Sequence, residues 1–163
     1  FITKYRRCLD IDNAILRYSF KAFGAPCESE SFVSYPAGCY VKKMEFGFVN
    51  RCRMDFQTLL KGGTIYEDGI FWIRVQAPSR VYPNYHYTAK PIVYDSKNKG
   101  MTAWCGIKIV TDGKLHYLMG GMRILDFRKL ELYMVTRTTY SDQNPRKYIK
   151  KKLEAAVEKG YKA

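Results

Sequence analysis

The longest regular pattern of apolar and polar positions runs from Trp104 to Arg137. Asp112-Gly113 lies between two apolar runs, and an Asp-Gly pair in that setting favours a two-residue hairpin turn, because both turn residues must tolerate positive φ. Gly120-Gly121 breaks the chain again, and from Leu130 to Met134 apolar side chains alternate with Glu131 and Tyr133. This alternation is typical of a half-buried strand. The pattern therefore predicts a meander of antiparallel strands with one solvated face.

A helix is expected near the N-terminus, because apolar residues recur at helical spacing from Ile11 to Phe23. Asp10 or Asp12 can cap its start. Gly24 and Pro26 would end it. Apolar residues occur on more than one face of this helix, so we expect it to be buried in its own domain or docked on a partner.

Between this helix and the meander, the pattern predicts strands, a short helix and irregular connections. In chain order these are an exposed polar loop at 28–38, a strand at 43–48, a short helix that Asp55 caps and Gly62-Gly63 stops, a strand at Ile70–Gln76, and a tyrosine-rich connection at 78–91.

The C-terminal helix has clear ends in the sequence. Asn144 can cap it, Pro145 suits its first position, and Gly160 stops it. Its first two turns carry five cations: Arg146, Lys147, Lys150, Lys151 and Lys152. A helix N-terminus favours acids, so cations there indicate an anionic partner outside the fold; a merely solvated face is the alternative.

The order of elements predicts an α+β protein, with an antiparallel sheet or meander on which an N-terminal helix, a short middle helix and a basic C-terminal helix are packed. The 163 residues suit a single domain over 1–163. Since the sequence begins with Phe1 and not with Met, we expect a further N-terminal segment to precede it.

The charge balance points to a polyanionic partner. Twenty-eight Lys and Arg face fifteen Asp and Glu, which gives a formal net charge of +13. Such an excess suits nucleic acid, nucleoprotein or an anionic membrane surface, whereas an ordinary basic protein is the alternative. Outside the C-terminal helix, the candidate polyanion-binding residues are Lys4, Arg6, Arg7, Lys97 and Lys99, and the candidate aromatic contacts are Tyr5, Tyr82, Tyr85 and Tyr148.

Catalytic and metal-binding motifs are missing from the sequence. It contains no phosphate-binding loop, no Gly-x-Ser-x-Gly and no His-Glu-x-x-His. The five cysteines form no Cys-x-x-Cys and, with two histidines, give no zinc-ligand spacing, so we expect reduced thiols, no metal and no cofactor. Cys105 and His116 could form a nucleophile pair across the hairpin, but a buried, inert thiol is the favoured interpretation. No apolar run is long enough to span a bilayer, and no signal peptide is visible in these residues.

The strand, turn and short helix in CYVKKMEFGFVNRCRMDFQTLLKGG (39–63), the apolar meander, and the strand followed by a helix at 130–160 resemble the matrix proteins of rhabdoviruses, including plant-infecting members. Size and basic charge are also similar. The Pro-Pro-x-Tyr budding motif often found in such proteins is absent from this sequence. The resemblance implies a non-enzymatic assembly protein that condenses a nucleocapsid, self-associates and lines a membrane.

The function expected from these observations is that of a viral matrix-like structural protein in virion assembly. It would form a homo-oligomer or lattice and bridge the nucleocapsid and an anionic membrane, bound peripherally without a transmembrane segment. Its location would be the virion and the host cytoplasm or nucleus, at the membrane periphery. The alternative is a non-specific nucleic-acid-binding protein such as a viral coat or movement protein, and an enzyme of unrecognised type comes third.

Overall fold

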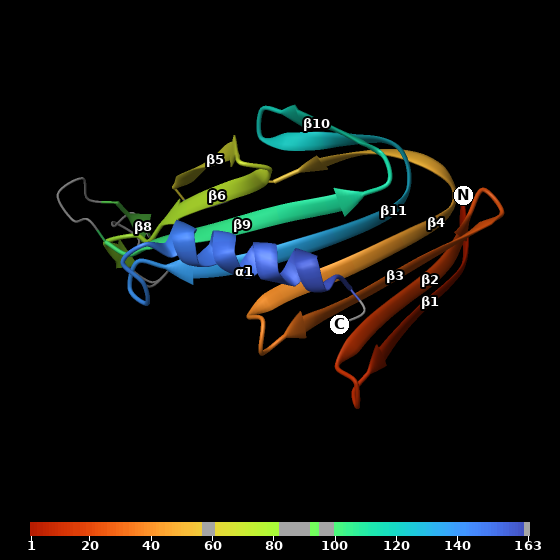
Figure 1. Ribbon diagram of the computed structural model, residues 1–163, viewed down its shortest axis with the longest axis horizontal. Coiled ribbons are helices and arrows are strands. Elements are labelled where there is room, and N and C mark those ends of the chain that lie inside the picture. The colour runs from red at the N-terminus through yellow and green to blue at the C-terminus, as the bar shows by residue number, and fades with distance from the viewer. Residues whose placement is uncertain (57–60, 82–91, 95–99, 162–163) are drawn as a thin grey trace, which may run out of the picture.

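The computed structural model describes residues 1–56, 61–81, 92–94 and 100–161, which form antiparallel strands and one α-helix (Figure 1). The strands are β1 (Ile2–Asp10), β2 (Ile15–Ala22), β3 (Ala25–Ser34), β4 (Cys39–Asp55), β5 (Gly62–Glu67), β6 (Ile70–Gln76), β7 (Arg80–Val81), β8 (Ile92–Val93), β9 (Thr102–Thr111), β10 (Lys114–Leu118) and β11 (Gly121–Thr138). The helix is α1 (Pro145–Lys159).

The main sheet has the order β1-β2-β3-β4-β11-β9-β6-β5, β10 adds to the side of β11, and β7 and β8 form a separate ribbon. The first four strands are neighbours in chain order. The chain then runs through β5, β6, β9 and β10 before β11 inserts between β4 and β9. The sheet is therefore assembled around a pairing between strands far apart in the sequence.

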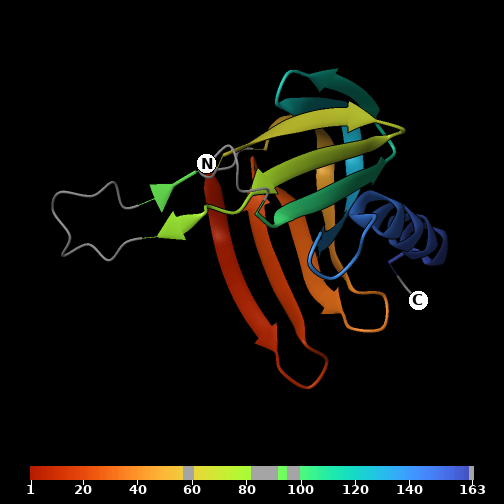
Figure 2. The ribbon, with the colours of Figure 1, turned by 90° about the vertical axis from the view of Figure 1, so that its left-hand side faces the viewer.

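The two longest strands, β4 with 17 residues and β11 with 18, bend and carry part of the sheet back over itself. The register between them shifts twice, between Ile124 and Phe127 and between Phe127 and Lys129. Bulges of this kind bend a strand and increase its twist. The first half of β11, the second half of β4 and β10 thus form a second layer, seen at the top of Figure 2. Tyr66 of the edge strand β5 stacks on Tyr117 of β10, and this contact links the main sheet to its second layer.

Two hydrophobic clusters lie on opposite faces of the central strands. On one face, Ile149 and Leu153 of α1 pack with Trp72, Tyr133 and Val135 of the sheet. Gly106 permits this contact, because a Cβ at that position would lie 2.5 Å from Cγ2 of Ile149.

The other face forms the core between the sheet and its second layer. Phe71 and Ile107 pack there with Ile124, Phe127 and Leu130 of β11. Both faces of the central strands are therefore buried, and the architecture resembles a β-sandwich with one helix on its outside.

The predicted α+β fold is wrong, and the N-terminal helix is the largest error. Residues 11–23 contribute the turn after β1, the whole of β2 and part of the next turn. Leu16, Tyr18 and Phe20 also recur at two-residue spacing, and this period prevails because β1 and β3 supply hydrogen-bonding partners on both sides of β2. Asp10 caps the β1–β2 turn, accepting a hydrogen bond from the Asn13 N–H at 3.1 Å, instead of capping a helix.

The predicted middle helix and exposed loop are also wrong. Asp55 ends β4 and Gly62 begins β5, while residues 57–60 lie outside the described part of the chain. The polar stretch 28–38 is mostly strand β3, in which Ser29 and Ser31 are buried between larger neighbours. Serine is small and polar, so hydropathy alone did not indicate a buried strand.

The predicted hairpin at Asp112-Gly113 is wrong, because β9 and β10 do not pair with each other and instead pair with successive halves of β11. Asp112 Oδ1 accepts hydrogen bonds from the backbone N–H groups of Arg128 and Lys129, at 3.0 and 2.9 Å, where the two halves meet. The tight turn instead joins β10 to β11 at Met119-Gly120, where Gly120 has a φ of 78°.

The prediction that the meander has one solvated face is wrong as well. Tyr133 of β11 is 1% exposed beneath α1. It lies on the face that the sequence pattern had assigned to solvent.

Other elements agree with the sequence. The strand Ile70–Gln76 is β6, with the predicted bounds. The C-terminal helix is confirmed in detail: the Asn144 side chain accepts a hydrogen bond from the Lys147 N–H, Pro145 is the first residue, and Gly160 follows the last turn.

Candidate polyanion-binding surfaces

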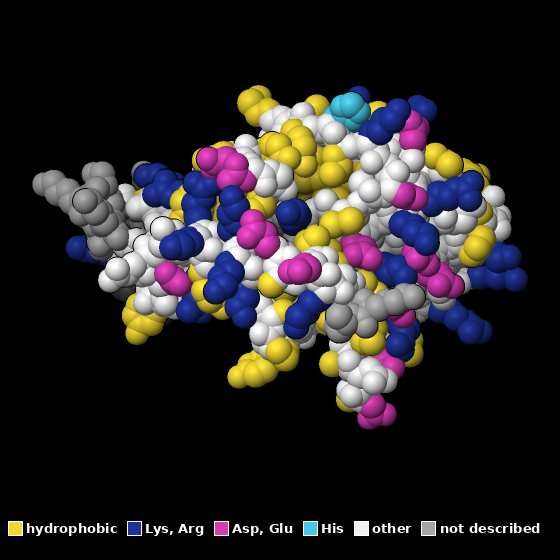
Figure 3. Space-filling model, in the orientation of Figure 1, with side chains coloured by type: hydrophobic (Ala, Val, Ile, Leu, Met, Phe, Trp, Pro, Cys, Tyr) yellow, Lys and Arg dark blue, Asp and Glu magenta, His cyan; other side chains and the backbone are white. Residues whose placement is uncertain are grey.

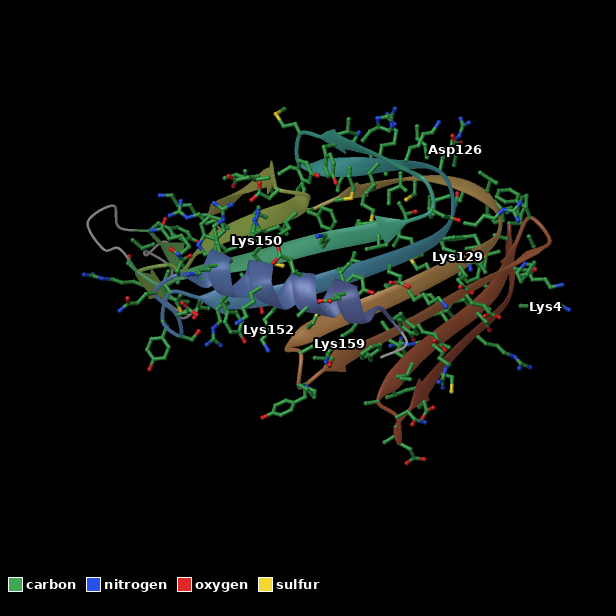
Figure 4. All side chains as sticks on the ribbon, viewed as in Figure 1. Lys4, Asp126, Lys129, Lys150, Lys152 and Lys159 are labelled. Atoms are coloured by element: carbon green, nitrogen blue, oxygen red, sulfur yellow. The ribbon has the colours of Figure 1, made fainter. Side chains whose placement is uncertain are left out.

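The five cations of α1, here called the helix patch (Arg146, Lys147, Lys150, Lys151 and Lys152), lie on the side of the helix away from the sheet or along its flanks. Ile149 and Leu153 are fully buried against the sheet and so fix the orientation of the helix. Figure 3 shows Lys and Arg side chains gathered over the first half of α1, and Figure 4 labels Lys150 and Lys152 along it.

Arg146 holds α1 on the sheet. The carbon of its guanidinium lies 4.6 Å from the ring centroid of Trp72 and 5.2 Å from that of Trp104. The same guanidinium forms an ion pair with Glu67 at the end of β5. Cation–π contacts with two indoles favour a planar guanidinium over an ammonium group. Arg146 is therefore a structural residue as well as a surface charge.

Two lysines of the helix patch also have partners within the fold. Lys150 Nζ lies 2.8 Å from Asp68 Oδ2, and their hydrogen bond raises the pKa of Lys150 and lowers the pKa of Asp68. Both side chains are largely exposed, so the pair stabilises the fold weakly. Lys152 Nζ donates to the backbone oxygen of Pro36 at 3.3 Å.

Lys147 and Lys151 are the free cations of the helix patch. Both are exposed, and no acidic group in the described part of the chain forms an ion pair with either. Tyr148, the predicted aromatic contact beside them, is half-buried with the Arg137 guanidinium carbon 4.4 Å from its ring centroid. It is therefore already stacked on a cation of its own chain.

The predicted N-terminal residues Lys4, Tyr5, Arg6 and Arg7 lie on β1, an edge strand exposed along nearly its whole length. Arg6 and Arg7 are consecutive in the regular part of β1 and so point to opposite faces, which means that these four side chains do not form one patch. The structure leaves Lys97, Lys99, Tyr82 and Tyr85 outside its described residues.

Tyr18 is the centre of an aromatic and basic group on the sheet face opposite α1. The Arg7 guanidinium carbon lies 5.6 Å and Lys42 Nζ lies 6.0 Å from its ring centroid. The ring of Tyr5 lies 6.3 Å away, at an interplanar angle of 47°. We call these four residues the Tyr18 group.

A second basic surface, absent from the sequence prediction, lies on the outer side of the second layer. His116 of β10 is directly opposite Arg123 of β11, which is directly opposite Arg53 of β4. All three side chains are exposed, and we call them the outer basic row. The sequence shows that polar and apolar residues alternate around each of these three positions. Only the strand pairing places the three side chains in one line across the sheet.

Cys105, the candidate nucleophile, is unsuited to nucleophilic chemistry. All five cysteines are free, and burial raises the pKa of Cys105 to about 11. Cys105 points into the core between the layers, whereas His116 lies on the outer side of β10, so the two do not form a pair. Burial also raises the pKa of Cys39 and Cys52.

Among the residues that the structure describes, no three His, Cys, Asp or Glu side chains gather as they would to hold a metal ion. Nor does any helix there combine the length and the apolar character required to cross a bilayer.

Comparison with known proteins gives a fold and no family. No protein-family model matches the chain, and no curated protein matches it. Over 98% of its length the chain is similar to a solved structure described as "Putative kojibiose phosphorylase from human microbiome", with a TM-score of 0.50 and 8% sequence identity. The match spans 22% of that protein. At this identity the similarity shows the β-rich fold alone.

Proposed function

We propose that the protein is a non-enzymatic, matrix-like structural protein that binds polyanions, self-associates, and bridges a nucleocapsid and an anionic membrane during virion assembly. The observation that carries the proposal is the presence of exposed cations on two separate layers of the molecule. Lys147 and Lys151 lie on α1, and the outer basic row lies on the second layer. The proposal places the protein in the virion and in the host cytoplasm or nucleus, at the membrane periphery.

The outer basic row supports a partner outside the fold. Like charges directly opposite each other on a sheet destabilise it, and Arg123 faces Arg53 in this way. Arg53 has an ion pair with Asp55, at 2.8 Å, but within the described residues neither Arg123 nor His116 has one. A bound polyanion would offset the repulsion.

The placement of the two surfaces supports bridging. α1 and the layer that contains β10 lie on different sides of the central strands and pack against opposite faces of them (Figure 2). A polyanion on one surface therefore leaves the other accessible to a second polyanion, which is the geometry that bridging requires.

A tethering experiment tests this proposal. Fluorescent RNA is mixed with the protein and with vesicles of phosphatidylcholine containing phosphatidylserine, and the RNA that floats with the vesicles is measured. We expect Lys147→Gln with Lys151→Gln, or Arg53→Gln with Arg123→Gln, to reduce tethering at least tenfold, since each cation near an anionic surface contributes about 1 kcal/mol. Lys61→Gln with Lys129→Gln removes the same charge from exposed positions elsewhere and is the control. Equal tethering by all three double variants would contradict the proposal.

Self-association has its own measurement. Negative-stain microscopy at low and high salt would be expected to show lattices or filaments of the purified protein. A protein that stays monomeric at every salt and protein concentration would remove self-association from the proposal.

The second candidate is a non-specific nucleic-acid-binding protein, and the Tyr18 group favours it. A ring flanked by two cations on a sheet face suits a stacked base with phosphates on either side. The discriminating measurement is binding to naked single strands of increasing length. Tight, length-dependent binding that Tyr18→Ala weakens by roughly tenfold or more would favour this candidate, since base stacking on an aromatic ring contributes about 1–3 kcal/mol.

A further inference from the structure

The turn between β2 and β3 places a phenylalanine where its backbone is unfavourable. Phe23 has a φ of 51° and Gly24 a φ of 82°, so both central residues of this two-residue turn are left-handed. Such turns prefer Asn, Asp or Gly, and a bulky residue with positive φ is strained. The Phe23 side chain is nevertheless 83% exposed. The positive φ costs stability, and a ring so exposed to solvent recovers little of it through packing within the fold. We take this combination to indicate a contact outside the fold.

Other exposed apolar side chains lie beside Phe23. Ile2, which is 66% exposed, belongs to β1 and is directly opposite Ala22, the residue before Phe23. The ring of Phe23 meets that of Phe48, a half-buried residue of β4, edge-to-face with 6.2 Å between the ring centroids. We call Ile2, Phe23 and Phe48 the apolar tip. Strands β1 and β4 contribute to it as well as the turn, so it is not the product of one irregular turn.

Two lysines lie near the apolar tip, and the chain segments around Ile2 and Phe23 carry no acid. Lys21 lies two residues before Phe23, and Lys4 projects from β1 at the extremity of the molecule (Figure 4). Residues 1–9 and 13–27 contain no Asp or Glu. The acids of this hairpin, Asp10 and Asp12, are at its opposite end.

We propose that the apolar tip inserts into the headgroup region of an anionic bilayer, with Phe23 as the anchor and Lys4 and Lys21 on the lipid phosphates and carboxylates. This inference rests on the membrane part of the proposed function and assigns that part to a site. Amphipathic insertion of this kind combines buried apolar side chains with nearby Lys and Arg. Ile2 offers no ring for base stacking, and the rings of Phe23 and Phe48 already pack edge-to-face on each other, so the chemistry of the tip suits lipid better than nucleic acid.

Phe23→Asn tests the anchor without harming the turn, because Asn tolerates a positive φ. The full chain is sedimented with vesicles of phosphatidylcholine containing phosphatidylserine, an anionic lipid that attracts Lys and Arg to the membrane surface. We expect Phe23→Asn to weaken binding by roughly tenfold, since burial of one Phe side chain contributes about 1.5–3 kcal/mol. Lys4→Gln with Lys21→Gln should weaken it by a similar factor and lower its salt dependence.

The matched control is Tyr35→Ser. Tyr35 is 95% exposed in the turn after β3, at the end of that strand away from Phe23, so its removal should leave vesicle binding within twofold of the parent protein. Phe23→Trp adds a direct readout of insertion. The fluorescence emission of the added tryptophan should shift to shorter wavelength with vesicles that contain phosphatidylserine, and it should not shift with vesicles of pure phosphatidylcholine.

The outcomes separate this inference from the proposed function. If the parent protein binds anionic vesicles and both tip variants bind equally well, the tip is overturned and membrane binding must come from the helix patch or the outer basic row. If the parent protein does not bind anionic vesicles at all, the result contradicts both the membrane part of the proposed function and the assignment of the apolar tip. Loss of RNA binding in Phe23→Asn, with vesicle binding unchanged, would make the tip a nucleic-acid contact and overturn the lipid assignment.

Discussion

The guanidinium of Arg146 lies over the indole of Trp72, with 4.6 Å between its central carbon and the ring centroid, and this contact joins the first turn of α1 to β6. The two residues are separated by most of the meander in sequence. Their contact fixes one end of α1 on the sheet, while Ile149 and Leu153 fix its middle.

Arg146→Ala should lower the free energy of unfolding by about 1–2 kcal/mol, because it removes a partly desolvated cation–π contact. Arg146→Lys keeps the charge and loses the planar stack, so it should recover only part of this stability. Urea unfolding followed by tryptophan fluorescence measures both variants. Full recovery by Lys would mean that charge alone matters at this position.

Gly113→Ala should destabilise the protein by about 1–3 kcal/mol through overpacking. A Cβ there would lie 2.4 Å from the Leu125 backbone oxygen and 2.6 Å from Cβ of Phe127. Gly63→Ala is the matched control, since a Cβ at Gly63 meets nothing within 4 Å. Equal denaturation midpoints for the two variants would contradict the close approach between the β9–β10 link and β11.

Acid should destabilise the N-terminal hairpin between about pH 4 and pH 2. Hydrogen bonds from Arg17 and Asn13 lower the pKa of Asp10 from 3.8 to about 2. A carboxyl group with a lower pKa in the folded state stabilises that state above its unfolded pKa, and this contribution is lost as pH falls through the folded value. Asp10→Asn should therefore show a smaller loss of stability over this range, measured by thermal unfolding at several pH values. An unchanged pH profile would show that Asp10 is not responsible.

Cys8 should be the first thiol to react with a maleimide at pH 8, because it is the exposed cysteine, whereas Cys27 and Cys39 are buried. Cys105 should react more slowly, since burial raises its pKa to about 11 and little thiolate is present. Mass spectrometry over time gives the order of modification. The Cys8→Ser variant should lack the fast phase, and a fast phase that persists there would identify another accessible thiol.

The sequence alone determined the features that depend on neighbouring residues. The bounds of α1 followed from Asn144, Pro145 and Gly160, which act within one turn of the helix. The strand Ile70–Gln76 followed from local alternation bounded by turn residues. The net charge and the cations of α1 were likewise readable, although their free or paired state was not.

Only the tertiary structure decided what depends on partners distant in sequence. Residues 11–23 fit both a helical and a strand period, and pairing of β2 with β1 and β3 selected the strand. Arg53, Arg123 and His116 form one row only because β11 inserts between β4 and β9 and also pairs with β10. Strand pairing satisfies backbone hydrogen bonds without regard to which side chains are involved, so local patterns do not specify the neighbour of each strand. Burial of both faces of β11 then settled which residues face the core, including Tyr133, whose place beneath α1 no local pattern indicated.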